Sequence, residues 1–398
     1  MSVSAKVTKL PVDGDASLIA SVRDIGRDVA SAHADDVDRQ ARFPSETIDA
    51  LRADGALAAF VPAELGGGAA SFETIAECCF ELGRCCGASA MVFAMHQIQV
   101  ITIVRHLDRG SWFEAYLSDL ARDQRLIASV TSEIGTGGDM GRSIAALTPA
   151  DDGQLSFEKR APTVSYGAHA NDFLTTLRRS PEAEPGDQVV ALTHQHQTTL
   201  APAGTWDVLG MRGTCSPGYT VRGTLSPEQV ISTPFARIAA ESMVPVSHIL
   251  WSHLWLGIAE NAFERARAFV RAAAKRTPGQ TPPMAQRLSR LMSELSMLRA
   301  EVHSAQRDFV VASSEPGRER LSTMALALRF NNLKIAASEH SVDICRGALD
   351  INGIMGFKND TPFSIGRHLR DTMSASLMIA NERIHQTNAG LLLIAKEV

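Results

Sequence analysis

The spacing of apolar positions divides the chain into a helical stretch, a β-prone stretch and a second helical stretch. From about residue 16 to 120, apolar side chains recur at helical spacing. The segment FPSETIDALRADG is typical of a short helix, with Ser45 as its N-cap and Gly55 as its stop. Ser71 can cap the next helix, and the long apolar segment 87–107 predicts a buried helix.

From about residue 125 to 235 the pattern changes to short β-prone runs separated by turn-rich stretches such as TPADDGQ. The runs are LIASVTS, DFLTTLRR, QVVALTHQ and QVISTPF. After about residue 240 the helical period returns. In segment 284–312 the apolar positions follow a three-and-four spacing, at Leu288, Leu291, Leu295, Leu298, Val302, Ala305 and Phe309.

At least four helices fit after residue 240, which is typical of a helical bundle. The order helical, β, helical therefore predicts an α+β fold of three domains. We expect an N-terminal helical domain over residues 1–122, a small middle β-domain over 123–238 and a C-terminal four-helix bundle over 239–398. A chain of 398 residues is long enough for several packed domains.

Composition and charge narrow the possible partners. The net charge is −5, the pI is about 6.2 and no basic tract stands out, which argues against nucleic acid as a partner. No apolar run reaches the roughly 20 residues needed to span a bilayer. Residues 1–15 lack an apolar signal core and are expected to be a loose tail. These features predict a cytoplasmic protein that needs no membrane.

Four of the six cysteines lie together in ECCFELGRCCG, which raises the possibility of a metal site. Zinc sites usually separate paired cysteines by two to four residues, and this spacing differs. On one helix Cys78 and Cys85 would share a face, as would Cys79 and Cys86. We therefore expect small buried side chains and no metal site.

Five local blocks carry a resemblance to a known family. They are RFPSETIDALRADGALAAFVPAELGGGAASF, SVTSEIGTGGDM, TWDVLGMRGTCSPG, LDINGIMGF and HLRD, in that order. Together they resemble the acyl-CoA dehydrogenase family from about residue 40 to the C-terminus. The resemblance implies a flavoprotein in which FAD lies between the β-domain and the C-terminal bundle.

The block SVTSEIGTGGDM resembles the family's thr-glu-x-gly-x-gly-ser-asp loop. The resemblance implies that Thr131 and Ser132 offer hydroxyls to the isoalloxazine edge. Gly135, Gly137 and Gly138 would let backbone amides approach a flavin or a pyrophosphate. A plain loop after a strand is the alternative.

A second flavin-facing block of the family, lys-x-trp-ile-thr, has its nearest equivalent in KRAPTVSYGAHAND. Counting back from Asn171 places Ser165 at the threonine and Thr163 at the tryptophan. Ser165 can still hydrogen-bond a flavin. The missing indole predicts a wider pocket or a different shield for the ring.

Related proteins complete the cofactor site from a neighbouring subunit. The resemblance implies that Asp350, Gly353 and Gly356 of LDINGIMGF lie near the adenosine end, with Arg276 as a substitute for a further contact. Asn381 occupies the position of a threonine in the family's tyr-glu-gly-thr block. A simple helix stop is the alternative for Gly353.

The family's catalytic carboxylate is missing. Dehydrogenation of an acyl thioester needs a base to remove the α-proton while hydride leaves the β-carbon. The usual glutamate falls on Ile379, and the alternative location in some relatives falls on Ser247. The candidate replacements are Glu382, one helical turn from Ile379, and His248, followed by two others, Glu241 and His96.

Three functions stay open. The first is α,β-dehydrogenation of an acyl thioester on CoA or a carrier protein, with an electron acceptor such as an electron-transfer flavoprotein. The second is a flavin monooxygenase or oxidase supplied with reduced flavin by a reductase. The third is a non-catalytic relative that binds FAD or acyl chains. The apolar C-terminal helices also predict a homo-oligomer, a tetramer before a dimer.

Overall fold

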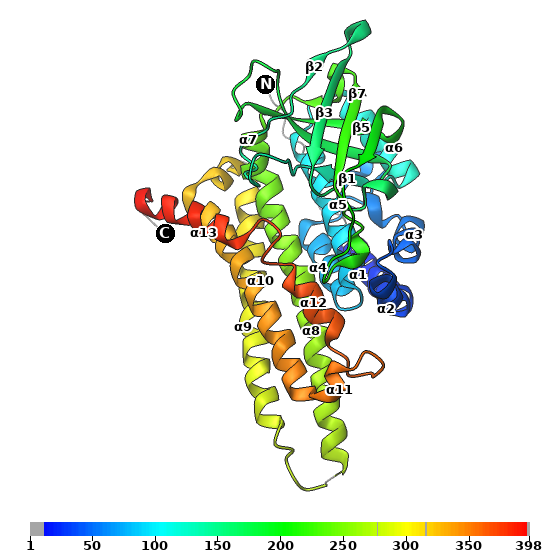
Figure 1. Cartoon of the computed structure of the whole chain (residues 1–398), viewed down its shortest axis with the longest axis vertical. Coiled ribbons are helices and arrows are strands. Elements are labelled where there is room, and N and C mark those ends of the chain that lie inside the picture. Colours follow the sequence, from blue (N-terminus) through cyan, green and yellow to red (C-terminus); the bar gives the residue numbers. More distant parts are fainter. Residues whose placement is uncertain (1–11, 277, 315–316, 396–398) are drawn as a thin grey trace.

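A β-domain lies at one end of three long helices, with the N-terminal helices packed beside both (Figure 1). This computed structural model describes residues 12–276, 278–314 and 317–395. The predicted α+β class and the order helical, β, helical are confirmed.

The N-terminal part is helical throughout. Its α-helices are α1 (Val12–Ile25), α2 (Ser31–Gln40), α3 (Ser45–Ala53), α4 (Phe72–Gly83), α5 (Gly87–His106) and α6 (Trp112–Asp123). Of the described helices, α5 alone is long and apolar enough to cross a membrane by length and composition, and 89% of its apolar window is buried inside the protein. The prediction of a buried helix over this segment is confirmed.

The middle part forms two four-stranded sheets. One sheet has the order β1 (Ile127–Val130), β4 (Asp172–Arg178), β5 (Gln188–His194) and β8 (Val230–Ile231), with β1 parallel to β4. The other has the order β2 (Thr148–Pro149), β3 (Leu155–Ala161), β7 (Tyr219–Leu225) and β6 (Thr198–Pro202). The four predicted runs contain β1, β4, β5 and β8. All four strands of the second sheet were missed.

The C-terminal part is built on α8 (Val244–Arg276), α9 (Ala285–Ser313) and α10 (Met324–Asn352). The predicted positions from Leu291 to Phe309 are the buried face of α9. Three shorter helices follow: α11 (Ile354–Phe357), α12 (Gly366–Met373) and α13 (Asn381–Ile394). In Figure 1, α13 points away from the long helices, and its buried residues are Asn381, Ile384 and Asn388.

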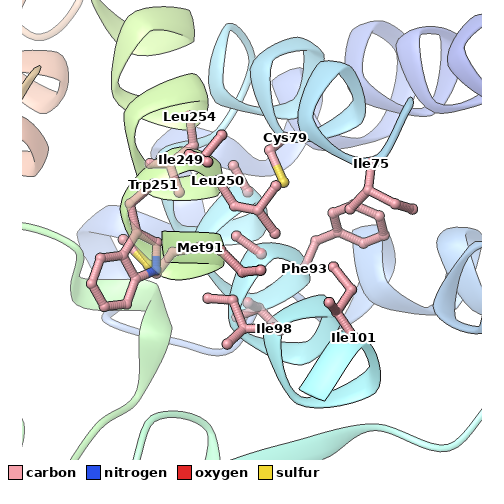
Figure 2. Close-up of a cluster of buried hydrophobic side chains, with 14 of the residues drawn as sticks. Ile75, Cys79, Met91, Phe93, Ile98, Ile101, Ile249, Leu250, Trp251 and Leu254 are labelled. Atoms are coloured by element: carbon pink, nitrogen blue, oxygen red, sulfur yellow. The ribbon is translucent and has the colours of Figure 1, made fainter. Parts of the chain in front are cut away.

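The core joins the N-terminal and C-terminal helices. Figure 2 shows side chains of α4, α5 and α8 packed together, among them Cys79, Phe93 and Leu254. Gly83 on α4 and Gly257 on α8 allow a close crossing, because an added Cβ would lie 2.4 Å from the Leu254 carbonyl oxygen or 2.3 Å from that of Phe80. This crossing fixes α8 against the N-terminal helices.

Several local predictions need correction. Ser45 is the first residue of α3 and Pro44 precedes it as the N-cap, whereas Ser71 accepts the Thr74 amide and caps α4 as predicted. The paired cysteines do not share one helix, since α4 ends at Gly83 before the second pair. Residues 12–15 of the expected tail belong to α1, and residues 1–11 lie outside the described residues.

Candidate active site

A cavity of about 730 Å³ lies where the β-domain meets α5, α8 and the segment between α12 and α13. Its walls are mostly apolar and rich in methionine. The methionines are Met91, Met95, Met140, Met211, Met243, Met373 and Met378. Trp206 and Trp251 add two indole rings. An apolar pocket with a few placed polar groups is the usual form of a small-molecule or cofactor site.

One wall of this cavity carries hydroxyl groups. Thr131 and Ser132 follow β1, and Ser165 lies in the loop before β4. Local hydrogen bonds hold them, since Ser132 Oγ donates to the Thr163 carbonyl oxygen at 2.8 Å and Ser216 Oγ donates to Ser165 Oγ at 2.9 Å. The structure therefore brings Thr131, Ser132 and Ser165 together on one surface.

The loop after this wall has an unusual backbone. Gly135, Gly137 and Gly138 have φ angles of 99°, 64° and 82°, a region that residues with a Cβ seldom adopt. Gly138 lines the cavity, and Gly137 precedes it. Successive amides in such a turn can form an anion-binding concavity.

A buried ion pair supports the hydroxyl wall from behind. Lys159 Nζ lies 3.7 Å from a Glu133 carboxylate oxygen and donates to the carbonyl oxygens of Thr131 and Thr176 at 3.3 and 2.7 Å. Burial lowers the pKa of Lys159 to about 8. Glu133 accepts the Ala145 amide at 2.6 Å. The pair ties the loop after β1 to both sheets.

The segment before α13 supplies another part of the lining. Ile379 lines the cavity with a φ of 48°, and Lys334 Nζ donates to its carbonyl oxygen at 2.9 Å. Glu382 is exposed and is not part of the lining. Asn381 faces α10, where its Oδ1 accepts from Lys334 Nζ at 2.7 Å. The structure therefore brings neither Glu382 nor Asn381 to the cavity.

Comparison with known families decides where this architecture belongs. The model described as "Acyl-CoA dehydrogenase, N-terminal domain" matches residues 14–123, and "Acyl-CoA dehydrogenase, C-terminal domain" matches residues 223–385. Together they match well over half of the chain. The chain belongs to the acyl-CoA dehydrogenase family. It is an enzyme of the flavin-dependent, acyl-CoA dehydrogenase-like kind.

The proteins similar to this chain include monooxygenases and an acyl-CoA dehydrogenase. The chain is 25% identical over 361 residues to a probable FMNH2-dependent monooxygenase of Pseudomonas putida, covering 86% of this chain and 87% of that protein. The FMN-bound structure of TdsC from Paenibacillus sp. A11-2, a dibenzothiophene monooxygenase, has a TM-score of 0.81 at 19% identity, over 95% and 97% of the two chains. Butyryl-CoA dehydrogenase of Megasphaera elsdenii has a TM-score of 0.78 at 17% identity, over 97% and 100%. These two structural likenesses show the fold alone.

The histidine candidates for a displaced acyl-CoA dehydrogenase base lie outside the cavity lining. His248 is buried against α10, with Nδ1 3.1 Å from the Phe330 carbonyl oxygen, and burial lowers its pKa to about 3. Both ring nitrogens of His96 are occupied by backbone groups of Leu57 and Ile127. Each of the two is a core histidine in this arrangement.

The carboxylate candidates for a displaced base are also unsuitable. Glu241 is buried and ion-paired with Arg237 at 2.7 Å and Arg318 at 3.1 Å. In the described lining, the carboxylates are Glu133, already bonded within its loop, and Asp139, whose Oδ1 accepts the Gly141 amide at 2.9 Å. Both belong to the glycine loop.

The predicted adenosine-end residues lie at the far end of the bundle, beside α11 in Figure 1. Asp350 and Gly353 are exposed, Gly356 is buried, and none of them lines the cavity. Gly353 has a φ of 55° and its amide donates to the Leu349 carbonyl oxygen at 2.8 Å, which is a helix end. Arg276 ends α8. Within this one chain, they form no common site with the hydroxyl wall.

Sequence reasoning missed much of the cavity. Gln99, Trp206, Arg370 and Arg383 all line it. Arg370 pairs with Asp38 and donates to the Leu209 carbonyl oxygen at 3.0 Å. Two signals were available. Trp206 and Arg370 lie in the blocks TWDVLGMRGTCSPG and HLRD, and Met91 and Met95 lie four residues apart on a helix already predicted to be buried.

Proposed function

We propose that this protein is a flavin-dependent monooxygenase that uses reduced flavin and O2, with a separate flavin reductase as its partner. The observation that carries the proposal is that the described lining offers no free base, since its carboxylates, Glu133 and Asp139, already accept hydrogen bonds within their own loop. Among the described lining residues, no His, Lys, Tyr or Cys is present. The place of the family's glutamate is taken by Ile379.

Removal of an α-proton requires a base within hydrogen-bond reach of the substrate. An isoleucine side chain has no acceptor atom, and the next carboxylate along the chain, Glu382, is exposed outside the cavity. Oxygen transfer by a flavin has no such requirement on the protein. The loss that disables dehydrogenation therefore leaves oxygenation possible.

The relatives support this choice over dehydrogenation. The protein of Pseudomonas putida, matched over most of both chains, is named a "Probable FMNH2-dependent monooxygenase". The fold itself does not discriminate, since TdsC and butyryl-CoA dehydrogenase have similar TM-scores. The lining residues, rather than the fold, favour the monooxygenase.

The donors of the cavity fit a flavin. The hydroxyls of Thr131, Ser132 and Ser165 suit the polar edge of an isoalloxazine ring, and the methionines opposite suit its apolar faces. Reduced flavin, when bound, supplies the electrons that activate O2. We propose FMN rather than FAD, because the named monooxygenase relative and the TdsC structure both use FMN.

The remaining walls favour a neutral, largely apolar substrate. Met91, Met95 and Ile98 on α5, Met243 just before α8 and Trp251 on α8 line the cavity with thioethers, an alkyl group and a ring. Methionine adapts its shape to flat and sulfur-containing groups. These side chains also exclude water from the reacting oxygen.

We also propose a homo-oligomer in the cytoplasm. Leu377 on the cavity rim is 76% exposed, and Leu393 near the end of α13 is 88% exposed. Such apolar surfaces are typical of protein interfaces. A tetramer is the state expected of this family, and light scattering of the purified protein measures it.

The test compares two assays on one preparation. We expect no flavin bleaching when FMN-loaded protein is mixed anaerobically with a panel of acyl-CoA thioesters. With FMN, a flavin reductase, NADH and O2, we expect an oxygenated product from a planar heteroaromatic such as dibenzothiophene or indole. Anaerobic bleaching by any acyl-CoA would overturn the proposal in favour of dehydrogenation.

A variant sharpens the comparison. Ile379→Glu places the missing carboxylate in the cavity, and Ile379→Gln is its uncharged match. If the base is all that dehydrogenation lacks, Ile379→Glu gains anaerobic flavin reduction by acyl-CoA and Ile379→Gln does not. A gain in both variants would show that proton removal is not what the wild type lacks.

A further inference from the structure

Methionine sulfur is concentrated in the walls of the cavity. Seven of the chain's 13 methionines line it. On α5, Met91, Met95 and Gln99 recur every four residues, so one face of the helix meets the cavity. No cysteine lies in the described lining. Thioethers are therefore the sulfur groups that face whatever binds there.

Met95 meets the cavity from the interior of the protein. Its neighbours along α5, Ala94 and His96, are fully buried, whereas Met95 is only partly buried and lines the cavity. Its accessible surface therefore belongs to the cavity wall. Met297, on α9, is 65% exposed and is not part of the lining. The two residues distinguish an oxidant formed inside the cavity from one that arrives from the solvent.

A second methionine is linked to the hydroxyl wall. Thr214 Oγ1 donates to the Met211 carbonyl oxygen at 2.9 Å and lies 2.9 Å from Ser216 Oγ, which donates to Ser165 Oγ. An added Cβ at Gly87 would be 3.4 Å from the Met211 Cε. The Met211 side chain therefore extends from the loop that supports Ser165 to the first turn of α5, and it is 4% exposed.

We propose that the lining methionines, Met95 among them, are a modification site at which turnover without substrate produces methionine sulfoxide. The inference rests on the proposed function, which supplies reduced flavin and O2 to the cavity. One oxygen atom of O2 bonds to the methionine sulfur, and the other leaves as water. Two electrons come from the sulfur, and two electrons with two protons come from reduced flavin. A thioether accepts an oxygen atom in this way without the loss of any bond.

The modification limits the activity of the enzyme. A sulfoxide is polar where the thioether is apolar, so it places an unpaired acceptor in a wall that suits apolar ligands. A bound substrate takes the oxygen itself and covers the thioethers. Turnover should therefore decline progressively when substrate is absent and persist when substrate is present.

The experiment maps methionine sulfoxide by peptide mass spectrometry after turnover with FMN, a flavin reductase, NADH and isotopically heavy O2. Catalase removes peroxide that escapes to the solvent, and the heavy oxygen distinguishes these sulfoxides from those formed during handling. We expect more heavy label at Met95 than at Met297, and less at Met95 when dibenzothiophene or indole is added. Hydrogen peroxide added without the reductase should oxidise Met297 first, because that side chain is exposed.

Two matched variants test the consequence. Met95→Leu and Met297→Leu each remove one thioether with little change in volume. Without substrate, Met95→Leu should lose its own initial rate more slowly than the wild type, and Met297→Leu should lose it as fast as the wild type. Methionine sulfoxide reductases should restore the rate of the inactivated wild type.

The label and the product assay separate the two proposals. Equal label at Met95 and Met297, or an unlabelled Met95, would overturn the modification site. If oxygenated product still forms in that case, the proposed function stands alone. Anaerobic bleaching of the flavin by an acyl-CoA would end the proposed function, and the label at Met95 would still decide the modification.

Discussion

Acidification should destabilise this protein through a histidine that the backbone keeps neutral. His96 on α5 is fully buried. Its Nε2 lies 2.7 Å from the Leu57 carbonyl oxygen, and its Nδ1 accepts the Ile127 amide at 3.1 Å. Only the neutral ring with its proton on Nε2 makes both bonds, because a charged imidazole has two donors and no acceptor. Burial lowers the pKa of His96 to about 4.

The sign and size of the effect follow from linkage. The unfolded ring has a pKa of about 6.5, so the unfolded state binds more protons than the folded state between pH 6.5 and 4. The stabilisation is complete above pH 6.5 and is lost as the pH falls towards 4. At pH 5 the loss from His96 is about 2 kcal/mol. His106, His248 and His253, each with a pKa lowered to about 3, act in the same direction.

Two acids oppose these histidines. Burial raises the pKa of Asp371 to about 6, so its contribution to stability falls as the pH rises from about 4 to 6, and burial raises the pKa of Glu77 as well. Four histidines against two carboxyls still leave a net loss on acidification. Because whole domains are stable by only about 5–15 kcal/mol, the unfolding midpoint should fall visibly between pH 7 and pH 5.

Urea denaturation at pH 7 and pH 5 tests the contribution of His96. We expect His96→Gln to cost about 1–3 kcal/mol at pH 7, since one glutamine cannot make both backbone bonds. Its further loss between pH 7 and pH 5 should be smaller than that of the wild type by about 2 kcal/mol. His385→Gln, at an exposed position on α13, serves as the control. An identical pH 7 to pH 5 loss in His96→Gln and wild type would refute the reasoning.

Two further predictions concern helix packing and the displaced base. Gly257→Ala should lower stability by about 1–3 kcal/mol, because its Cβ would lie 2.3 Å from a backbone oxygen, whereas Gly390→Ala should raise it by about 0.5–1 kcal/mol, because nothing lies within 4 Å of that Cβ. Equal effects of the two changes in thermal melts would contradict the close crossing. Glu382→Gln should leave turnover and flavin affinity within twofold, and a hundredfold loss of turnover would restore Glu382 as the catalytic base.

Two of the missed strands alternate regularly between buried and exposed positions, but each has a residue without an apolar side chain at a buried position. β3 alternates buried and exposed positions, but Lys159 occupies one of its buried positions. β7 alternates in the same way, and Gly223 stands at a buried position because the Phe157 ring fills the space, 2.4 Å from where its Cβ would be. A lysine and a glycine at inward positions remove the apolar signal on which strand prediction depends.

Some residues that line the cavity could be predicted from local sequence motifs, whereas others are brought to the cavity only by the folding of the chain. Thr131, Ser132 and Ser165 were predictable, because each lies in a block whose sequence resembles a family motif. Met243 and Arg383 were not, since neither lies in such a block and their segments meet only in the folded chain. The failure of Glu382 as a base has the same origin. Glu382 lies about one helical turn beyond Ile379 in the sequence, and this position is outside the cavity.

The backbone conformation of Ile379 indicates that its side chain has a role. A β-branched residue at a φ of 48° is rare and costs about 1–2 kcal/mol relative to ordinary backbone. The bond from Lys334 Nζ to the Ile379 carbonyl oxygen helps to hold this conformation. A glycine would adopt the same backbone without strain. Strain retained at a residue that lines the cavity points to a role for the side chain itself. An apolar wall that offers no proton acceptor and excludes water is what an oxygen-transferring flavin site needs at this position, and a dehydrogenase needs the opposite.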